Sequence, residues 1–160
     1  FKDLQALGWL EKMPRLFGVQ SYGSAAIANA FHTGSEEIIP VKADTIADSI
    51  SVDLPRDGVR AVRAARETGA SYLLVEDGDI LAAIADMGKV GIFSEPTGAT
   101  SYAGLKKAIA SKLIGEEDPV LVMVTGSGLK DVRAAVKAVG DAPIIEPSMS
   151  ALKAFLTPRH

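Results

Sequence analysis

Cysteine is absent from the 160 residues of this chain, and histidine occurs only twice. The missing cysteine excludes disulfide bonds, thiolate nucleophiles and zinc-thiolate sites. His32 and His160 are the two imidazoles, and His160 is the last residue. So few histidines argue against a two-histidine metal site and against a Ser-His-Asp triad. We therefore assign no metal site, and we interpret His32 as a favourable charge at a helix C-terminus.

The chain also lacks an excess of basic residues and any long apolar run. The formal net charge is −3 and the pI is near 5.4, whereas a nucleic-acid surface needs clustered Lys and Arg. The densest basic segment, 56–66, contains Asp57 and has the spacing of a solvated helix face. No apolar run reaches the roughly 18 residues that cross a membrane. We expect no nucleic-acid partner and no membrane partner.

Strand-like and helix-like patterns alternate along the chain. The length fits one domain, and 48% hydrophobic with 23% charged residues is typical of a globular protein. Alternation of this kind indicates parallel βαβ units, so we predict a single α/β domain, 1–160, with three αβα layers and a mostly parallel sheet. The spacing predicts helices over 1–13, 24–31, 56–68, 77–87, 99–113, 130–139 and 148–155, and strands over 16–20, 71–75, 91–93, 120–124 and 143–145.

Residues 33–55 form the least regular segment of the sequence. We interpret them as a long functional loop with a short helical turn near 44–48. The loop carries Asp44, Asp48 and Asp53. Their spacing does not match a calcium-binding loop, so we interpret them as solvated carboxylates.

Two glycine-containing turns, 93–100 and 123–131, each lead into a helical pattern. A strand that ends on small residues before a helix is a common ligand site in α/β sheets. The Thr-Gly-Ser-Gly sequence at 125–128 fits neither the Walker spacing nor Gly-x-Gly-x-x-Gly, because position 131 is Asp. From the residues alone, a tight turn that packs helix on strand is the favoured interpretation. Glu95 is interpreted in the same way, as an acid at a helix N-terminus.

An ordered set of segments extends the interpretation, because together they resemble the C-terminal half of threonine synthases. Those enzymes belong to the fold type II, tryptophan-synthase-β-like family that depends on pyridoxal phosphate. The Glu-Pro-small-Gly-Ala pattern at 95–99 is shared by many members of this fold. Thr-Gly-x-Gly-Leu-Lys-Asp at 125–131 is more particular to threonine synthases and close relatives such as cysteate synthases. The resemblance covers nearly the whole chain, through segments 1–8, 14–20, 45–50, 91–99 and 124–131.

The resemblance implies pyridoxal 5'-phosphate as the cofactor and three cofactor-binding residues. Thr125 matches the hydroxyl residue that meets the pyridine nitrogen at the end of a late strand. A neutral hydroxyl suits an unprotonated pyridine, whereas a carboxylate would hold a proton there. Glu95 falls at the turn that faces the cofactor. Ser49 lies in the segment that lines the cleft, where the family more commonly has a small residue such as alanine.

The same resemblance implies that no catalytic residue lies in this chain. The family's Schiff-base lysine belongs to a Ser-x-Lys-Asp-Arg motif in the N-terminal half, and neither this motif nor the Asn- and Gly-rich phosphate loop is present. Lys2 superficially resembles that lysine, but the residues after it match the helix that follows the phosphate loop. Phe1 rather than Met also opens the chain. We expect a C-terminal fragment of a longer enzyme that is inactive alone.

The implied reaction converts O-phosphohomoserine and water to threonine and phosphate, in a cytoplasmic homodimer that acts on a small amino-acid substrate. Two alternatives stay open at this point. One is a sister enzyme of the same fold, such as cysteate synthase or threonine dehydratase. The other is a non-catalytic α/β binding domain. The residues that would distinguish the sister enzymes bind the substrate's phosphate or sulfonate, and most of them belong to the other half of the enzyme.

Overall fold

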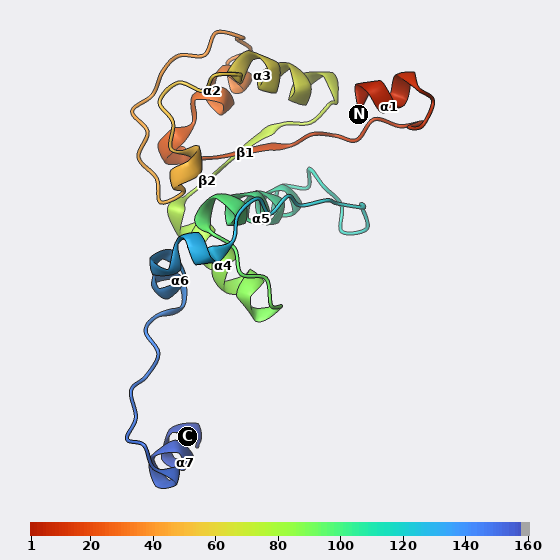
Figure 1. Ribbon diagram of the computed structural model, residues 1–160. Coiled ribbons are helices and arrows are strands. Elements are labelled where there is room, and N and C mark those ends of the chain that lie inside the picture. The colour runs from red at the N-terminus through yellow and green to blue at the C-terminus, as the bar shows by residue number, and fades with distance from the viewer. Residues whose placement is uncertain (158–160) are drawn as a thin grey trace.

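The computed structural model, which describes residues 1–157, is built on two parallel strands (Figure 1). β1 (Gly18–Ser21) pairs with β2 (Tyr72–Val75), with Gly18 opposite Tyr72 and Ser21 opposite Val75. Parallel strands need a crossover connection, and this one contains two helices, α2 (Ala26–His32) and α3 (Gly58–Glu67). The sequence placed both strands within two residues of their bounds.

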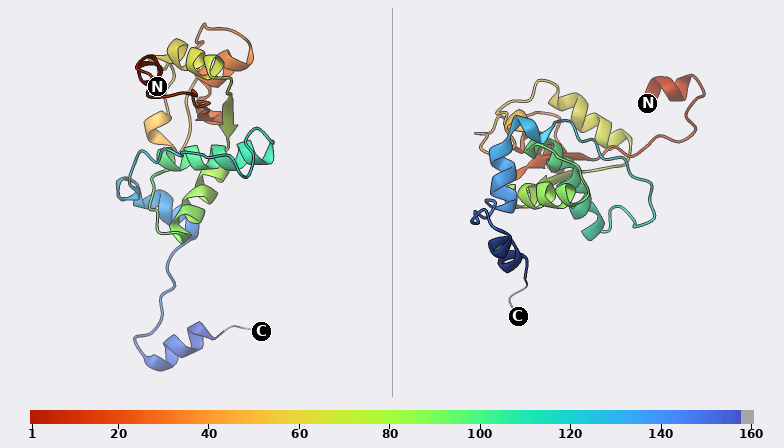
Figure 2. Two further views of the ribbon diagram at one scale, coloured as in Figure 1. Left: turned by 90° about the vertical axis from the view of Figure 1, so that its right-hand side faces the viewer. Right: turned by 60° about the horizontal axis from the view of Figure 1, so that its bottom comes forward.

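Helices cover both faces of the two strands. α2 and α3 pack on one face, and α5 (Pro96–Ala110) packs on the other with α4 (Asp77–Lys89) beside it (Figures 1 and 2). This arrangement confirms the predicted three-layer α/β class with a parallel sheet. Pro96 occupies the first turn of α5, where its missing N–H leaves no helix hydrogen bond unmade.

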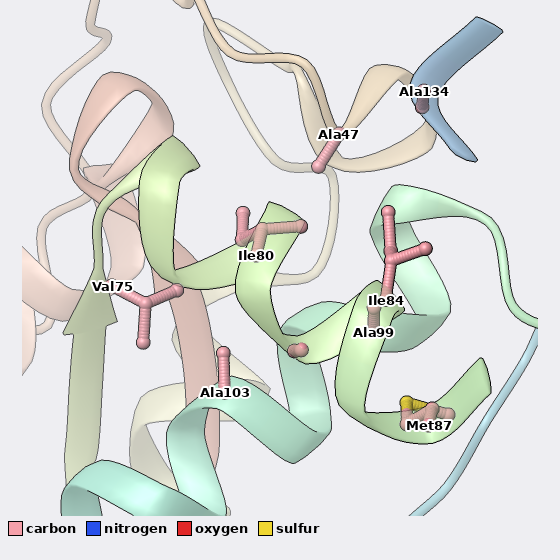
Figure 3. Packing of buried hydrophobic residues seen from close by; sticks show 9 residues of the cluster. Ala47, Val75, Ile80, Ile84, Met87, Ala99, Ala103 and Ala134 are labelled. Atoms are coloured by element: carbon pink, nitrogen blue, oxygen red, sulfur yellow. The ribbon is translucent and has the colours of Figure 1, made fainter. Parts of the chain in front are cut away.

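The largest buried cluster lies between α4, α5 and the end of β2. α4 contributes Ile80, Ile84 and Met87 at the spacing of one helix face. α5 contributes the small residues Ala99 and Ala103, which let the two helices approach closely (Figure 3). Ala47 of the irregular loop and Ala134 of α6 (Val132–Val139) complete this cluster, so the loop is packed on the core.

The first predicted helix is wrong beyond its opening turns. α1 spans only Lys2–Ala6, because Gly8 adopts a φ of 73° and closes the helix. The Gly8 and Trp9 amides donate to the carbonyls of Gln5 and Leu4, which is the usual ending at a left-handed glycine. Leu4 and Leu7 are exposed, so this helix presents no apolar face to the core.

Three predicted strands, 91–93, 120–124 and 143–145, are not strands in the structure of residues 1–157. Only an isolated antiparallel bridge between Ser94 and Ser127 forms near them. A strand exists through its neighbour's hydrogen bonds, and apolar segment 120–124 pairs with no strand among the described residues. Leu121 is accordingly 84% exposed.

The remaining elements are short helices. Those in the chain's irregular parts are the 3₁₀ turns η1 (Tyr22–Ser24), η2 (Asp48–Ile50) and η3 (Gly128–Lys130). The predicted helical turn near 44–48 therefore lies further along, at η2. The terminal helix α7 (Met149–Leu156) begins at a Ser148 cap and lies at the end of an extended segment (Figure 1). No helix within residues 1–157 is long and apolar enough to cross a membrane.

Asp86 of α4 joins the two central helices at the surface and predicts a pH effect. It accepts hydrogen bonds from Lys106 of α5 at 2.6 Å and from Lys89 at 2.9 Å, which lower its pKa from 3.8 to about 2. A carboxyl whose pKa is lower in the folded than in the unfolded chain stabilises the folded state at pH values above its unfolded pKa. This stabilisation is lost as the pH falls through the folded pKa.

We expect Asp86→Asn to be less stable than the parent protein near pH 6, and this difference to shrink steadily as the pH falls from about 4 to 2. Denaturant unfolding of both proteins across this range measures the difference. Added salt should shrink it near pH 6, because the ions are exposed. A stability difference that is independent of pH would contradict the ion-pair explanation.

Candidate functional site

The two glycine-containing turns are bonded directly to each other. The Glu95 amide donates to the Gly126 carbonyl at 3.1 Å, and the Gly128 amide donates to the Phe93 carbonyl at 3.0 Å. Ser94 and Ser127 form the bridge between these two bonds. The segments form a single structural unit, although they are well separated in the sequence.

Close approach explains why glycine occurs twice in the second of these turns, at 126 and 128. A Cβ at Gly126 would lie 1.5 Å from Oε1 of Glu95. A Cβ at Gly128 would lie 2.3 Å from the ring of Phe93. Neither glycine has a positive φ, so each is needed for space rather than for backbone freedom. The preference for packing that the residues alone favoured is therefore part of the explanation.

Glu95 is held by contacts that the sequence did not predict. It occupies the N-cap position of α5, but its side chain makes no capping hydrogen bond. The carboxylate instead packs against Gly126 and accepts a hydrogen bond from Lys130 Nζ at 3.3 Å. Glu95 is only 8% exposed, and a carboxylate in such a position needs a charged partner. Interpreting Glu95 as a helix cap was therefore wrong about its side chain.

Lys130 is the residue that sequence reasoning missed. It is the last residue of η3, two residues after the Thr-Gly-Ser-Gly sequence, and its side chain is largely exposed except where it meets Glu95. The signal was available, because the Lys belongs to the Gly-Leu-Lys-Asp ending that carried the resemblance. What the sequence could not give was the contact with Glu95 in the other turn.

A cavity of about 300 Å³ opens beside this unit. Glu95 and Ser49, two of the three predicted cofactor-binding residues, both line it. Thr125, the third, is exposed and precedes Gly126, but it is not among the lining residues. The rest of the lining comes from the loop and from both turns: Ile46, Asp48, Pro96, Thr97, Lys130 and Asp131.

The loop wall of this cavity is fixed at its far end by Ser24. The Ser24 hydroxyl donates to the Ile50 carbonyl at 2.8 Å and accepts from the Val52 amide at 3.1 Å. Ser24 is 1% exposed, so these bonds are sheltered from water. They hold the end of η2, which carries Ser49, against the junction of β1 and α2.

The residues present suit the ring of pyridoxal phosphate. Ser49 lines the cavity and Thr125 is exposed just before Gly126, so both hydroxyls are accessible to a ligand. Lys130 supplies the cationic side chain of the cavity wall. These groups match a neutral aromatic ring with polar substituents. Their roles as cofactor ligands stay predictions.

Lys2 lies away from this cavity. It belongs to α1, which lies apart from α4, α5 and α6 (Figures 1 and 2), and it forms an ion pair with Glu67. Its position agrees with the sequence argument against Lys2 as a cofactor-bound lysine. Within the described residues, no three His, Asp or Glu side chains gather in a way that could hold a metal ion.

Comparisons with known proteins agree on one family. A family profile described as "Pyridoxal-phosphate dependent enzyme" matches residues 2–126. The threonine synthase of Methanocaldococcus jannaschii is 35% identical over 158 residues, which are 98% of this chain and 39% of that protein. The threonine synthase of Methanosarcina acetivorans is 31% identical over 155 residues, which are 96% of this chain and 38% of that protein.

Solved structures show the same fold. Threonine synthase from Escherichia coli matches with a TM-score of 0.64 and 18% identity, over 96% of this chain and 35% of that chain. Threonine deaminase isoform 2 from Solanum lycopersicum matches with a TM-score of 0.63 and 22% identity, over 86% and 38%. This chain thus spans about two-fifths of the length of the curated relatives it matches. The chain belongs to the pyridoxal-phosphate dependent enzyme family, which confirms the resemblance and the cofactor expected from the sequence.

Proposed function

We propose that this chain forms one wall of the active site in a longer threonine synthase, which converts O-phosphohomoserine and water to threonine and phosphate. The observation that carries the proposal is the bonded pair of turns, with Glu95 against Gly126 and Ser49 on the same cavity. The two motifs of the resemblance meet in this pair. Identities of 31 to 35% to threonine synthases support the same reaction.

Three residues of this chain would hold the cofactor ring. Thr125 would donate a hydrogen bond from its hydroxyl to the pyridine nitrogen, which keeps that nitrogen unprotonated. Glu95, fixed by Lys130 and Gly126, would stand beside the ring, and Ser49 would close the loop side of the cavity. The bound cofactor supplies an electron sink for carbanions next to the amino group.

The proton transfers of the reaction need a base that these residues do not provide. Lys130 is engaged with Glu95, and Lys2 is paired with Glu67 at a distance from the cavity. We therefore propose that the catalytic lysine and the phosphate-binding loop belong to the other part of the longer enzyme. The 160 residues alone should show no turnover. A homodimer is also proposed, and the molar mass of the complete enzyme in solution tests it.

Product analysis of the complete enzyme tests the reaction. We expect turnover of O-phosphohomoserine to threonine and phosphate, and much slower turnover of two other substrates. O-phosphoserine with sulfite tests for a cysteate synthase, and threonine alone tests for a dehydratase. Preference for either would replace the proposed reaction within the same family. No turnover of any of them, with no cofactor bound, would favour a non-catalytic binding protein.

Thr125 provides a test of the proposed ring contact. We expect Thr125→Ala to lower kcat/KM by about 10- to 100-fold, which corresponds to one lost hydrogen bond of roughly 1.4 to 2.7 kcal/mol. Thr125→Ser keeps the hydroxyl and should retain most of the activity. Thr125→Asp should alter the visible spectrum of the bound cofactor, because a carboxylate favours a protonated pyridine. Equal activities of the Ala and Ser variants would remove Thr125 from the site.

A further inference from the structure

We propose that Asp77 is a positioning residue that fixes the loop wall of the cofactor cavity. The inference rests on the proposed function, because it concerns the wall that carries Ser49. Asp77 is the first residue of α4 and does not line the cavity itself. Its side chain nevertheless connects three parts of the chain: the end of β1, the irregular loop and α4.

The Asp77 carboxylate accepts hydrogen bonds from three donors. Oδ1 accepts from the Ser21 hydroxyl at 3.2 Å and from the Thr45 hydroxyl at 2.5 Å. Oδ2 accepts from the Ile46 amide at 3.0 Å. Both oxygens are therefore engaged, and two of the three donors belong to the loop. Charge-assisted bonds of this kind are stronger than bonds between neutral groups.

The two hydrogen bonds from the loop to Asp77 come from the residues at which the loop begins to line the cavity. Ile46 lines the cavity, and η2 with Asp48 and Ser49 begins two residues later. Ala47, between them, is fully buried in the core (Figure 3). Asp77 therefore holds the start of this segment at residues 45–46, and Ser24 holds its end at residues 50–52. Loss of one anchor should loosen the wall while Ala47 and Ser24 keep the loop on the protein.

Helix capping does not account for the same side chain. Asp79 accepts from the Glu76 amide at 3.0 Å and so serves the first turn of α4. The helix N-terminus still favours the negative charge of Asp77, but none of these three hydrogen bonds goes to a free amide of the helix. Asp77 and Asp79 are two carboxylates of one helical turn with different partners, which makes Asp79 the matched control.

Asparagine should largely replace Asp77, whereas alanine should not. The amide oxygen of Asn can accept from the Ile46 amide, and its NH₂ can donate to the Ser21 and Thr45 hydroxyls, which also act as acceptors. All three contacts can therefore be kept in Asp77→Asn. Asp77→Ala removes them all. Thr45→Val removes one donor at nearly constant volume and serves if Asp77→Ala does not fold.

Hydrogen exchange of the complete enzyme without cofactor or substrate tests the inference. In Asp77→Ala we expect the Ile46 and Ile50 amides to exchange at least about 10-fold faster, with amides of β2 and α5 unchanged. Thr45→Val should show a smaller change at Ile46. Asp77→Asn keeps the three contacts without their charge, so its loop amides should exchange only slightly faster than in the parent protein. Asp79→Ala should leave them unchanged.

Cofactor binding provides the second readout. Asp77→Ala should raise the dissociation constant of the cofactor by about 10-fold, and Asp77→Asn should restore it. Unchanged exchange of the loop amides in both Asp77→Ala and Thr45→Val would overturn the inference. Loop amides that exchange as fast in Asp79→Ala as in Asp77→Ala would also overturn it. The exchange measurement needs no ligand or substrate. A wrong reaction under the proposed function would therefore leave it intact.

Discussion

Gly126→Ala should lower the activity of the complete enzyme by at least about 100-fold and its free energy of unfolding by about 2 to 3 kcal/mol. The new methyl group would lie 1.5 Å from Oε1 of Glu95 and 2.3 Å from Cδ, so the carboxylate has to leave its place. The Glu95 carboxylate then loses the hydrogen bond from Lys130 at 3.3 Å and its buried position at the start of α5. Steady-state kinetics and denaturant unfolding measure the two effects.

The clash with Glu95 predicts a specific rescue. In Gly126→Ala/Glu95→Ala the methyl group meets no carboxylate, so most of the lost stability should return while activity stays low. Gly78→Ala is the matched control. A Cβ there would have no atom within 4 Å, and alanine is more favourable than glycine at an exposed helix position. Additive effects of the two substitutions would contradict the proposed contact.

Gly23→Ala is expected to have the largest effect on stability, about 3 kcal/mol or more. Its Cβ would lie 1.8 Å from the backbone oxygen of Asp44 and 2.8 Å from the carbonyl carbon. The Asp44 amide also donates to the Gly23 carbonyl at 2.9 Å. At Gly126 a side chain can move aside, whereas here the loop backbone itself has to separate from η1.

Detachment of this loop gives the second result expected for Gly23→Ala. The cavity wall should open, so the amides of residues 44–50 should lose protection from hydrogen exchange together with the fall in stability. Gly88→Ala on the exposed side of α4 is the control, with no atom within 4 Å of its Cβ. It should be neutral or stabilising by about 0.5 to 1 kcal/mol. Equal stabilities of the two variants would show that the loop does not need this close contact.

Sequence patterns identified the elements that have regular apolar spacing and find a pairing or packing partner within the described residues. β1 and β2 pair with each other, and the connection that contains α2 and α3 brings them together. α4 and α5 carry their apolar and small residues on one face, at the spacing that defines a helix. The predicted strand at 120–124 was wrong because an apolar pattern becomes a strand only beside a bonding partner.

Three conclusions could therefore be reached from the residues alone: the α/β class, the exclusion of cysteine chemistry, and the two motifs that indicated the family and its cofactor. The folded chain was needed to see that these motifs bond to each other, that Lys130 pairs with the buried Glu95, and that Asp77 accepts a hydrogen bond from the loop carrying Ser49. The difference lies in the range of the interactions. Helical spacing and turn residues act over a few positions, whereas these contacts join residues about 30 positions apart, whose meeting depends on the packed core.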